Sequence, residues 1–526
     1  MNRWSALAVI LLFAGALAFR FPRLDARPLH NDEAVNAVKV AELWESGHYR
    51  YDPDEYHGPS LHYATLPFLS LSGAASPNEL KEWVLRLAPV LFGAALPLVL
   101  FLFADGLGRH AIVWSSLFIA ISPAMVFYSR YFIHEMLLVF FTTLTIGSAW
   151  RYVQSRSIDS KDVARAGGMS YTSPFWAIAA GLGLGLMFAT KETFVLSIAA
   201  MGIAALGTAA LTSPRKIRGI VASNARDLAL GFGTTFLVWL LFFSSFFTNF
   251  HGLLDSFLTY MPWLKRAGGD SPHIHPWYFY LQRLAWFHPV KGPYWSEGLV
   301  LLLAVIGVIV SIRRKNPLLR FVALYTFVLT AIYSAISYKT PWCLLNFYIG
   351  MILLAGVGAA ACVEFVRSRP IRFTIAALLL AGSAQLAAQS WRASYQYTSD
   401  RRNPYVYAQT VPDILNLVDR AEGLARVSLD GFETIVKVIA PEDDYWPLPW
   451  YLRRFEHIGW YDKLPADPFA PIIIVSSKLD ARLDDASERK WLMAGLTELR
   501  PGQFFELYVE LQLWTKYVEG LPPAPE

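Results

Sequence analysis

The stretch WVLRLAPVLFGAALPLVLFLF, residues 83–103, holds a single charged side chain, Arg86, among twenty uncharged residues. A helix needs about 20 mainly apolar residues to cross the hydrocarbon core of a bilayer. A second run, Leu299 to Ile312, has no charged residue at all. Stretches of this kind predict membrane-spanning helices, and they decide the fold class of the chain.

The overall composition supports this prediction. Of the 526 residues, 55% are hydrophobic and 17% are charged, whereas a soluble protein has about a quarter charged residues. The first run, Trp4 to Phe19, has the length of a signal peptide, but many further spans follow it, so we interpret it as a retained helix. We predict a polytopic α-helical membrane protein with about eleven spans, near residues 4–20, 84–104, 111–128, 132–150, 174–189, 193–211, 228–247, 298–312, 319–336, 344–364 and 372–390.

Lys and Arg residues cluster in every second loop between these spans. Such an excess is typical of cytoplasmic loops. We therefore expect a multi-pass protein of the cytoplasmic membrane with its N-terminus inside, and with the loops 21–83 and 248–297 and the tail outside. Because the net charge of +5 comes from the loop clusters, it does not indicate a nucleic-acid partner. The clusters lie near residues 109, 151–165, 215–226, 313–320 and 367–372.

The tail differs from the rest of the chain because it is polar and mixed. We divide the chain into a membrane module, residues 1–390, and an extracytoplasmic domain, residues 391–526. The tail combines strand-like runs with one helix-like run, which predicts a small α/β domain. The strand-like runs are Ile435–Ile439, Ile472–Val475 and Phe505–Leu511, and the helix-like run is Glu488–Leu496.

Polar residues follow the first span directly, in His30-Asn31-Asp32-Glu33-Ala34. The next ten residues, 35–44, have helical apolar spacing and predict a helix along the membrane surface, with Asn31 or Asp32 as its cap. Acidic residues are common at helix starts, so capping alone would also explain this acidic pair.

A second polar group joins the third and fourth spans with almost no loop, and contains Arg130, His134 and Glu135. Burying such groups at the membrane edge is costly unless they pair or line a wet cavity. The alternative is an interfacial Arg130 that extends to the membrane surface with Glu135 as its partner.

Three further sites fall on the same predicted face. They contain His57, the pair Lys191-Glu192, and Lys339. Lone lysines at span ends are often membrane anchors, and the His57 segment also fits a turn. The motif His273-Ile274-His275 suggests a metal, but the adjacent Trp277 and Tyr278 favour an interfacial aromatic belt.

Together these sites place carboxylates and cations on one face. An active site there would suit a lipid-phosphate donor, because cations would bind the phosphate and a carboxylate would take a proton from an acceptor hydroxyl. Cys343 and Cys362 give neither a disulfide framework nor metal-ligand spacing.

At this point the sequence resembles the GT-C superfamily of membrane glycosyltransferases, in the branch of protein O-mannosyltransferases and lipid A aminoarabinose transferases. The Asp-Glu pair after the first span, the helix behind it and the Arg…Glu pair carry this resemblance. More narrowly, the chain is similar to Agl23-type "flippase activity-associated" proteins through four motifs: His30–Ala34, Tyr56–Pro59, Ala189–Glu192 and Pro447–Leu452.

The resemblance implies a polyprenyl-phosphate sugar donor, an inverting transfer at the outer leaflet, and a glycan, lipid or protein acceptor. Asp32 matches the catalytic acid of the first loop, Glu33 would assist it, and Glu135 matches the second acidic position. Arg130 would lie near the phosphate, and we add His134, His57, Lys191, Glu192 and Lys339 as substrate-binding residues.

We predict a glycosyltransferase without a metal or other cofactor, because the nearest Asp-x-Asp in the first loop is the Pro-bound Asp52-Pro53-Asp54. One alternative is a transporter, but transporters place ionisable groups near the midplane and often show repeated halves. The other is a non-catalytic membrane component of a lipid-linked glycan flippase or assembly system.

Overall fold

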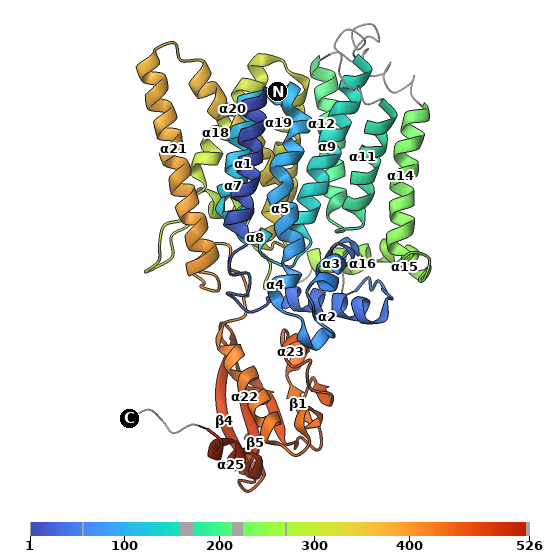
Figure 1. The fold of residues 1–526 in the computed structure, drawn as a ribbon, viewed down its shortest axis with the longest axis vertical. Coiled ribbons are helices and arrows are strands. Elements are labelled where there is room, and N and C mark those ends of the chain that lie inside the picture. Colours follow the sequence, from blue (N-terminus) through green and yellow to red (C-terminus); the bar gives the residue numbers. More distant parts are fainter. Residues whose placement is uncertain (1, 55–56, 158–172, 213–224, 269–270, 522–526) are drawn as a thin grey trace.

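The computed structural model describes residues 2–54, 57–157, 173–212, 225–268 and 271–521. A bundle of long helices forms the larger part, and a small sheet domain projects from one end of it (Figure 1). We call this end of the bundle the domain end.

A helix occurs at each of the eleven predicted positions. Eight of the described helices are long and apolar enough to cross a membrane, or nine if the bent pair α7–α8 counts as one span. Two others, α11 and α18, have 16 and 17 residues, so the exact number of crossings stays a prediction. The bundle helices are α1 (Arg3–Arg20), α4 (Glu82–Leu85), α5 (Leu87–Val99), α6 (Ala104–Leu107), α7 (Arg109–Ile121), α8 (Pro123–Ser129), α9 (Glu135–Ser157), α11 (Ser173–Phe188), α12 (Phe194–Thr212), α14 (Ala225–Phe243), α18 (Gly298–Arg314), α19 (Pro317–Ala335), α20 (Leu345–Glu364) and α21 (Arg369–Trp391).

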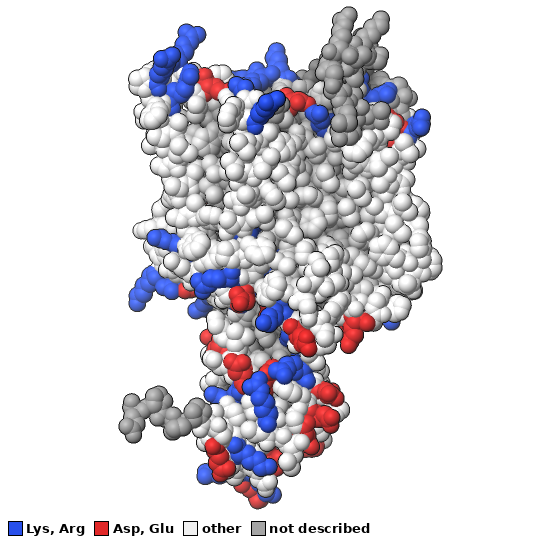
Figure 2. Space-filling model, in the orientation of Figure 1, with Lys and Arg blue, Asp and Glu red and all other residues white. Residues whose placement is uncertain are grey.

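Helix α20 is the centre of the bundle and is almost completely buried. Its glycines permit close packing, because a Cβ on Gly356 would collide with α7 and one on Gly358 would collide with the Leu303 carbonyl of α18. Small residues allow this close approach between membrane helices. The outer surface of the bundle has a broad band without charge, and charged side chains lie on both sides of this band (Figure 2). The predicted orientation, with the N-terminus inside, stays a prediction.

Short helices cover the domain end of the bundle (Figure 1). The first of them, α2, forms where a surface helix was expected. Its cap differs from the prediction: His30, and not Asn31 or Asp32, adopts the extended N-cap conformation. The short helices are α2 (Asn31–Ser46), α3 (Ser60–Leu71), α15 (His251–Leu258), α16 (Tyr260–Gly268) and α17 (Phe279–Ala285).

The tail forms a five-stranded sheet in the order β2-β1-β3-β5-β4, with β2, β1 and β3 parallel and the other pairs antiparallel. The three predicted strands are confirmed as β1, β3 and β5. The predicted helix over Glu488–Leu496 is wrong, because β4 pairs there with β5. The residue spacing in a short apolar run fits a strand and a helix alike. The pairing with β5 determines that this segment is a strand. The strands are β1 (Val436–Ile439), β2 (Ile458–Tyr461), β3 (Ile472–Ser476), β4 (Trp491–Arg500) and β5 (Gln503–Glu510), with helices α22 (Asp413–Val427), α23 (Leu448–Tyr451), α24 (Leu483–Ala486) and α25 (Leu511–Glu519).

The sheet domain is fixed to the first long loop through the segment that follows β1. The hydroxyl of Tyr451 accepts a hydrogen bond from the Leu29 N–H at 2.8 Å, and Trp450 Nε1 donates to Glu82 at 2.9 Å. Arg453 donates to the carbonyls of Pro77 and Leu80. The carboxyl end of β1 therefore faces the membrane module.

The linker between α21 and the sheet domain is also bound to the bundle. Gln409 Nε2 donates to the Pro28 carbonyl at 3.0 Å, and its Oε1 accepts from the Tyr131 hydroxyl at 2.8 Å. Tyr405 donates to Glu297 at 2.8 Å. The linker thus contacts both long loops and the junction of α8 with α9.

Candidate active site

A cavity of about 240 Å³ lies at the domain end, beside the first turn of α12 and the last turn of α19. Four of its lining side chains are acidic, basic or histidine: Asp32, His57, Lys191 and Glu192. Most of the remaining wall is aromatic or aliphatic, and includes Trp263, Leu196, Tyr333, Ile336 and Trp342. Four of the nine predicted site residues therefore share one cavity.

Asp32 is the second residue of α2, at the cavity wall. Its carboxylate is 42% exposed and lies 3.6 Å from His30 Nδ1. It can therefore be reached by a substrate in the cavity. It lies in the first turn of α2, and the amino end of a helix favours a negative charge.

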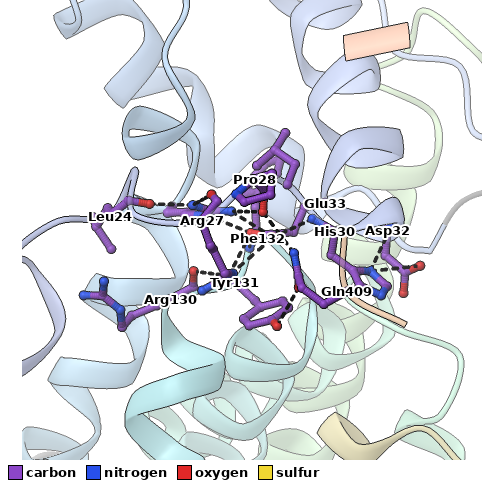
Figure 3. Close-up of polar contacts among 12 residues, drawn as sticks. Leu24, Arg27, Pro28, His30, Asp32, Glu33, Arg130, Tyr131, Phe132 and Gln409 are labelled. Carbon is purple, nitrogen blue, oxygen red and sulfur yellow. Dashed lines mark hydrogen bonds and ion pairs between the residues drawn. The ribbon is translucent and has the colours of Figure 1, made fainter. Parts of the chain in front are cut away.

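Glu33 is fully buried and lies outside the cavity lining. It accepts hydrogen bonds from Arg86 at 2.8 and 2.9 Å, from Arg27 at 3.3 Å, and from the backbone N–H groups of His30 and Phe132 at 3.0 and 2.8 Å (Figure 3). Burial opposes ionisation, but Arg86 and Arg27 outweigh it and hold the pKa of Glu33 at about 2. A carboxylate engaged in this way holds the loop together, so the structure does not support its expected catalytic role.

Arg130 is also turned away from the cavity. Its guanidinium donates to the carbonyls of Arg20, Pro22 and Arg23 at 2.6 to 2.8 Å, at the end of the first span. Figure 3 shows it on the far side of the group from Asp32. The expected contact of Arg130 with a donor phosphate is not supported by this arrangement.

Lys191 lines the cavity from the turn between α11 and α12, and forms an ion pair with Glu135. Burial alone would lower the pKa of Lys191, but Glu135 outweighs burial and raises the pKa above its ordinary value. Lys191 therefore stays protonated. Glu135 is 1% exposed and lies behind Lys191, so it acts on the cavity through this lysine.

His57 and Glu192 form a second pair in the cavity, with Nδ1 2.8 Å from the carboxylate. Burial opposes the ionisation of Glu192, but His57 outweighs it and lowers the pKa of Glu192. The His57 ring stacks on Trp263 at 5.1 Å. His134 is buried, and its Nε2 donates to the Gly58 carbonyl at 3.0 Å, so it fixes the turn that carries His57.

Gly58 is required at this turn for a steric reason. A Cβ on Gly58 would collide with the backbone of Ala189 and Thr190. The Gly58 N–H donates to the Thr190 carbonyl at 3.1 Å. The first loop and the turn of Lys191 are therefore in direct backbone contact.

Lys339 donates to the carbonyls of His275 and Ile336 and does not line the cavity. It joins the second long loop to the end of α19, and burial lowers its pKa. In the described part of the chain, no group of three or more His, Cys, Asp or Glu side chains is placed to hold a metal ion. His273 and His275 instead flank the Tyr407 hydroxyl at 2.8 and 3.0 Å.

Two buried carboxylate networks were not predicted from the sequence. In the first network, Glu33 pairs with Arg86. Arg86 is the only charged residue in an apolar run, and this position was a usable signal for the network. Glu297 accepts from Tyr348, Tyr405, Ser122 and the Ala124 N–H. Nothing in its local sequence indicates this network.

Known structures share this fold. ArnT from Cupriavidus metallidurans bound to undecaprenyl phosphate has 17% sequence identity and a TM-score of 0.64, covering 95% of this chain and 97% of that one. The archaeal oligosaccharyltransferase AglB from Archaeoglobus fulgidus, in complex with an inhibitory peptide and a dolichol-phosphate, has 11% identity and a TM-score of 0.56, covering 91% and 70%. At these identities the likeness establishes the fold, which is that of the GT-C membrane glycosyltransferases.

The sequence comparison finds one family that matches part of the chain. Residues 62–254 match the family of dolichyl-phosphate-mannose-protein mannosyltransferases. None of the curated proteins matches the chain. The predicted resemblance to the GT-C superfamily is confirmed, while the narrower resemblance to Agl23-type proteins stays a prediction.

Proposed function

We propose that this protein is a glycosyltransferase that moves a sugar from a polyprenyl-phosphate donor to an acceptor hydroxyl at the outer face of the cytoplasmic membrane. The observation that supports this most is the single cavity that contains an accessible carboxylate, Asp32, and a protonated amine, Lys191, within a largely aromatic and aliphatic wall.

The walls of the cavity suit a lipid-linked donor. Leu196 and Ile336 lie on the outer turns of α12 and α19, where an isoprenoid chain would enter from the bilayer. Lys191 would bind the donor phosphate, with His57 close to it. Cations placed where negative charge develops stabilise the transition state of group transfer.

In the reaction that we propose, Asp32 takes the proton of the acceptor hydroxyl as its oxygen attacks the anomeric carbon of the sugar. The bond between that carbon and the phosphate oxygen breaks, and the lipid phosphate leaves with the electron pair. Lys191 neutralises the charge on the leaving phosphate. Attack opposite the leaving group inverts the configuration at the anomeric carbon.

The test uses purified protein and a polyprenyl-phosphate sugar labelled in the sugar. Asp32→Asn removes the base while keeping the shape, and transfer to acceptor should fall by about 10²-fold or more. Asp25→Asn, at an exposed position of the same loop, is the matched control and should retain activity. Full transfer by Asp32→Asn would refute the assignment. Absence of transfer in the wild type with cell-envelope acceptors would favour the non-catalytic flippase or assembly component.

A further inference from the structure

His30, the residue before α2, has an unusual position for an N-cap. It is 3% exposed, and its Nδ1 accepts a hydrogen bond from the Asp32 N–H at 3.1 Å. On its other side, Nε2 lies 3.1 Å from the carbonyl oxygen of Tyr407 in the linker. Figure 3 shows the ring directly beside Asp32.

These two contacts determine the protonation state of the ring. A carbonyl oxygen only accepts, so Nε2 must carry the hydrogen. A backbone N–H only donates, so Nδ1 must be bare. His30 is therefore the neutral imidazole with its hydrogen on Nε2, and the linker carbonyl selects this tautomer.

A proton on Nδ1 would reverse the relation between His30 and Asp32. The Asp32 N–H would lose its acceptor, and the new N–H would face the Asp32 carboxylate, whose Oδ1 is 3.6 Å from Nδ1. A small rotation would then form a charged hydrogen bond. The carboxylate would be held by His30 and not be free toward the cavity.

The groups around His30 oppose one another. Burial has the largest effect and lowers the pKa of His30 below its ordinary value, while the carboxylates of Asp32 and Glu33 act in the opposite direction. Arg500 of the sheet domain also lowers the pKa of His30, and His273 of the second loop interacts with His30. The rings of Trp342 and Tyr131 pack around it at 5.3 and 6.3 Å.

We propose that His30 is the positioning residue of Asp32: when neutral it fixes the first turn of α2 and leaves the carboxylate free, and when protonated it captures the carboxylate and stops transfer. This inference rests on the proposed function. Because the pKa of His30 is lowered, the neutral ring persists through neutral pH, and transfer should fall as the pH drops below the ordinary histidine range.

The test compares two substitutions across a pH series of labelled-sugar transfer. Asn is a preferred N-cap that accepts the same N–H but does not titrate, so His30→Asn should keep transfer near the wild-type rate at neutral pH and move the acid-side midpoint to lower pH. His30→Ala has no acceptor and should reduce kcat at every pH. His48→Asn, an exposed position of the same loop, should match the wild type. An unchanged acid-side midpoint in His30→Asn would overturn the proposal.

A second measurement does not require activity. Nitrogen NMR of full-length protein labelled in histidine should show the His30 ring with its hydrogen on Nε2, the signal being assigned by its loss in His30→Asn. In Asp32→Asn the pKa of His30 should fall further, because the neighbouring carboxylate charge is gone. A hydrogen on Nδ1 at neutral pH would overturn the proposal, even if the transferase assignment holds.

Discussion

The buried ion pairs of Glu33 should make this one residue a large contributor to stability. Glu33→Gln removes the charge that Arg86 and Arg27 share, and leaves two buried guanidinium groups without their carboxylate partner. Breaking a buried ion pair by removing one partner costs about 3–5 kcal/mol. A second route gives a similar size: a pKa of about 2 in place of 4.5 corresponds to about 3 kcal/mol.

The sign of the pH dependence follows from the direction of this pKa. The pKa of Glu33 is lower in the folded protein than its ordinary value of 4.5, so its stabilisation is present above about pH 4.5 and is lost as the pH falls toward about 2. In Glu33→Gln this part of the acid dependence should be absent.

Thermal unfolding of the purified protein in detergent, followed by loss of monodisperse protein, measures this effect. Glu42→Gln is the matched control, because Glu42 lies on the same helix and forms an exposed pair with Lys39, which is worth about 1 kcal/mol or less. Glu33→Gln should unfold at a clearly lower temperature than Glu42→Gln. Equal unfolding temperatures would refute the reasoning.

Three further predictions follow from the cavity and the networks around it. Lys191→Gln should lower donor transfer by about 10²-fold, whereas Lys81→Gln, at an exposed position on the first loop, should leave it unchanged; equal loss in both would contradict a phosphate role. Exhaustive chelation with EDTA should leave transfer intact, and restoration of a lost activity by added Mg²⁺ would contradict this. Glu297→Ala leaves four donors without an acceptor and should destabilise the fold by about 3 kcal/mol or more, with Glu297→Gln milder in the same unfolding assay.

The helices could be predicted from the sequence because their signal is local. Each apolar run contains nearly all the information that makes it a helix, and the run at residues 83–103 needed no partner to be recognised. β4 could not be predicted in this way, because its strand conformation depends on pairing with β5.

The candidate site was predictable only in part, for the same physical reason. Asp32 and Lys191 were identified because charged residues at span ends are conspicuous. Whether a charge faces a cavity or a buried partner depends on residues far away: Arg86 is 53 positions from Glu33, and Arg130 binds carbonyls 107 to 110 positions away. The spacing of residues along the sequence contains no information about these contacts.

Because of the linker, the membrane module and the sheet domain are not separable. A chain cut after α21 would lack the Tyr407 carbonyl that selects the His30 tautomer and the Gln409 amide that binds Pro28. Such a truncated protein would be impaired even if acceptors never touch the sheet. Grafting the tail of a relative onto this bundle would therefore succeed only when residues 405–409 stay with the bundle.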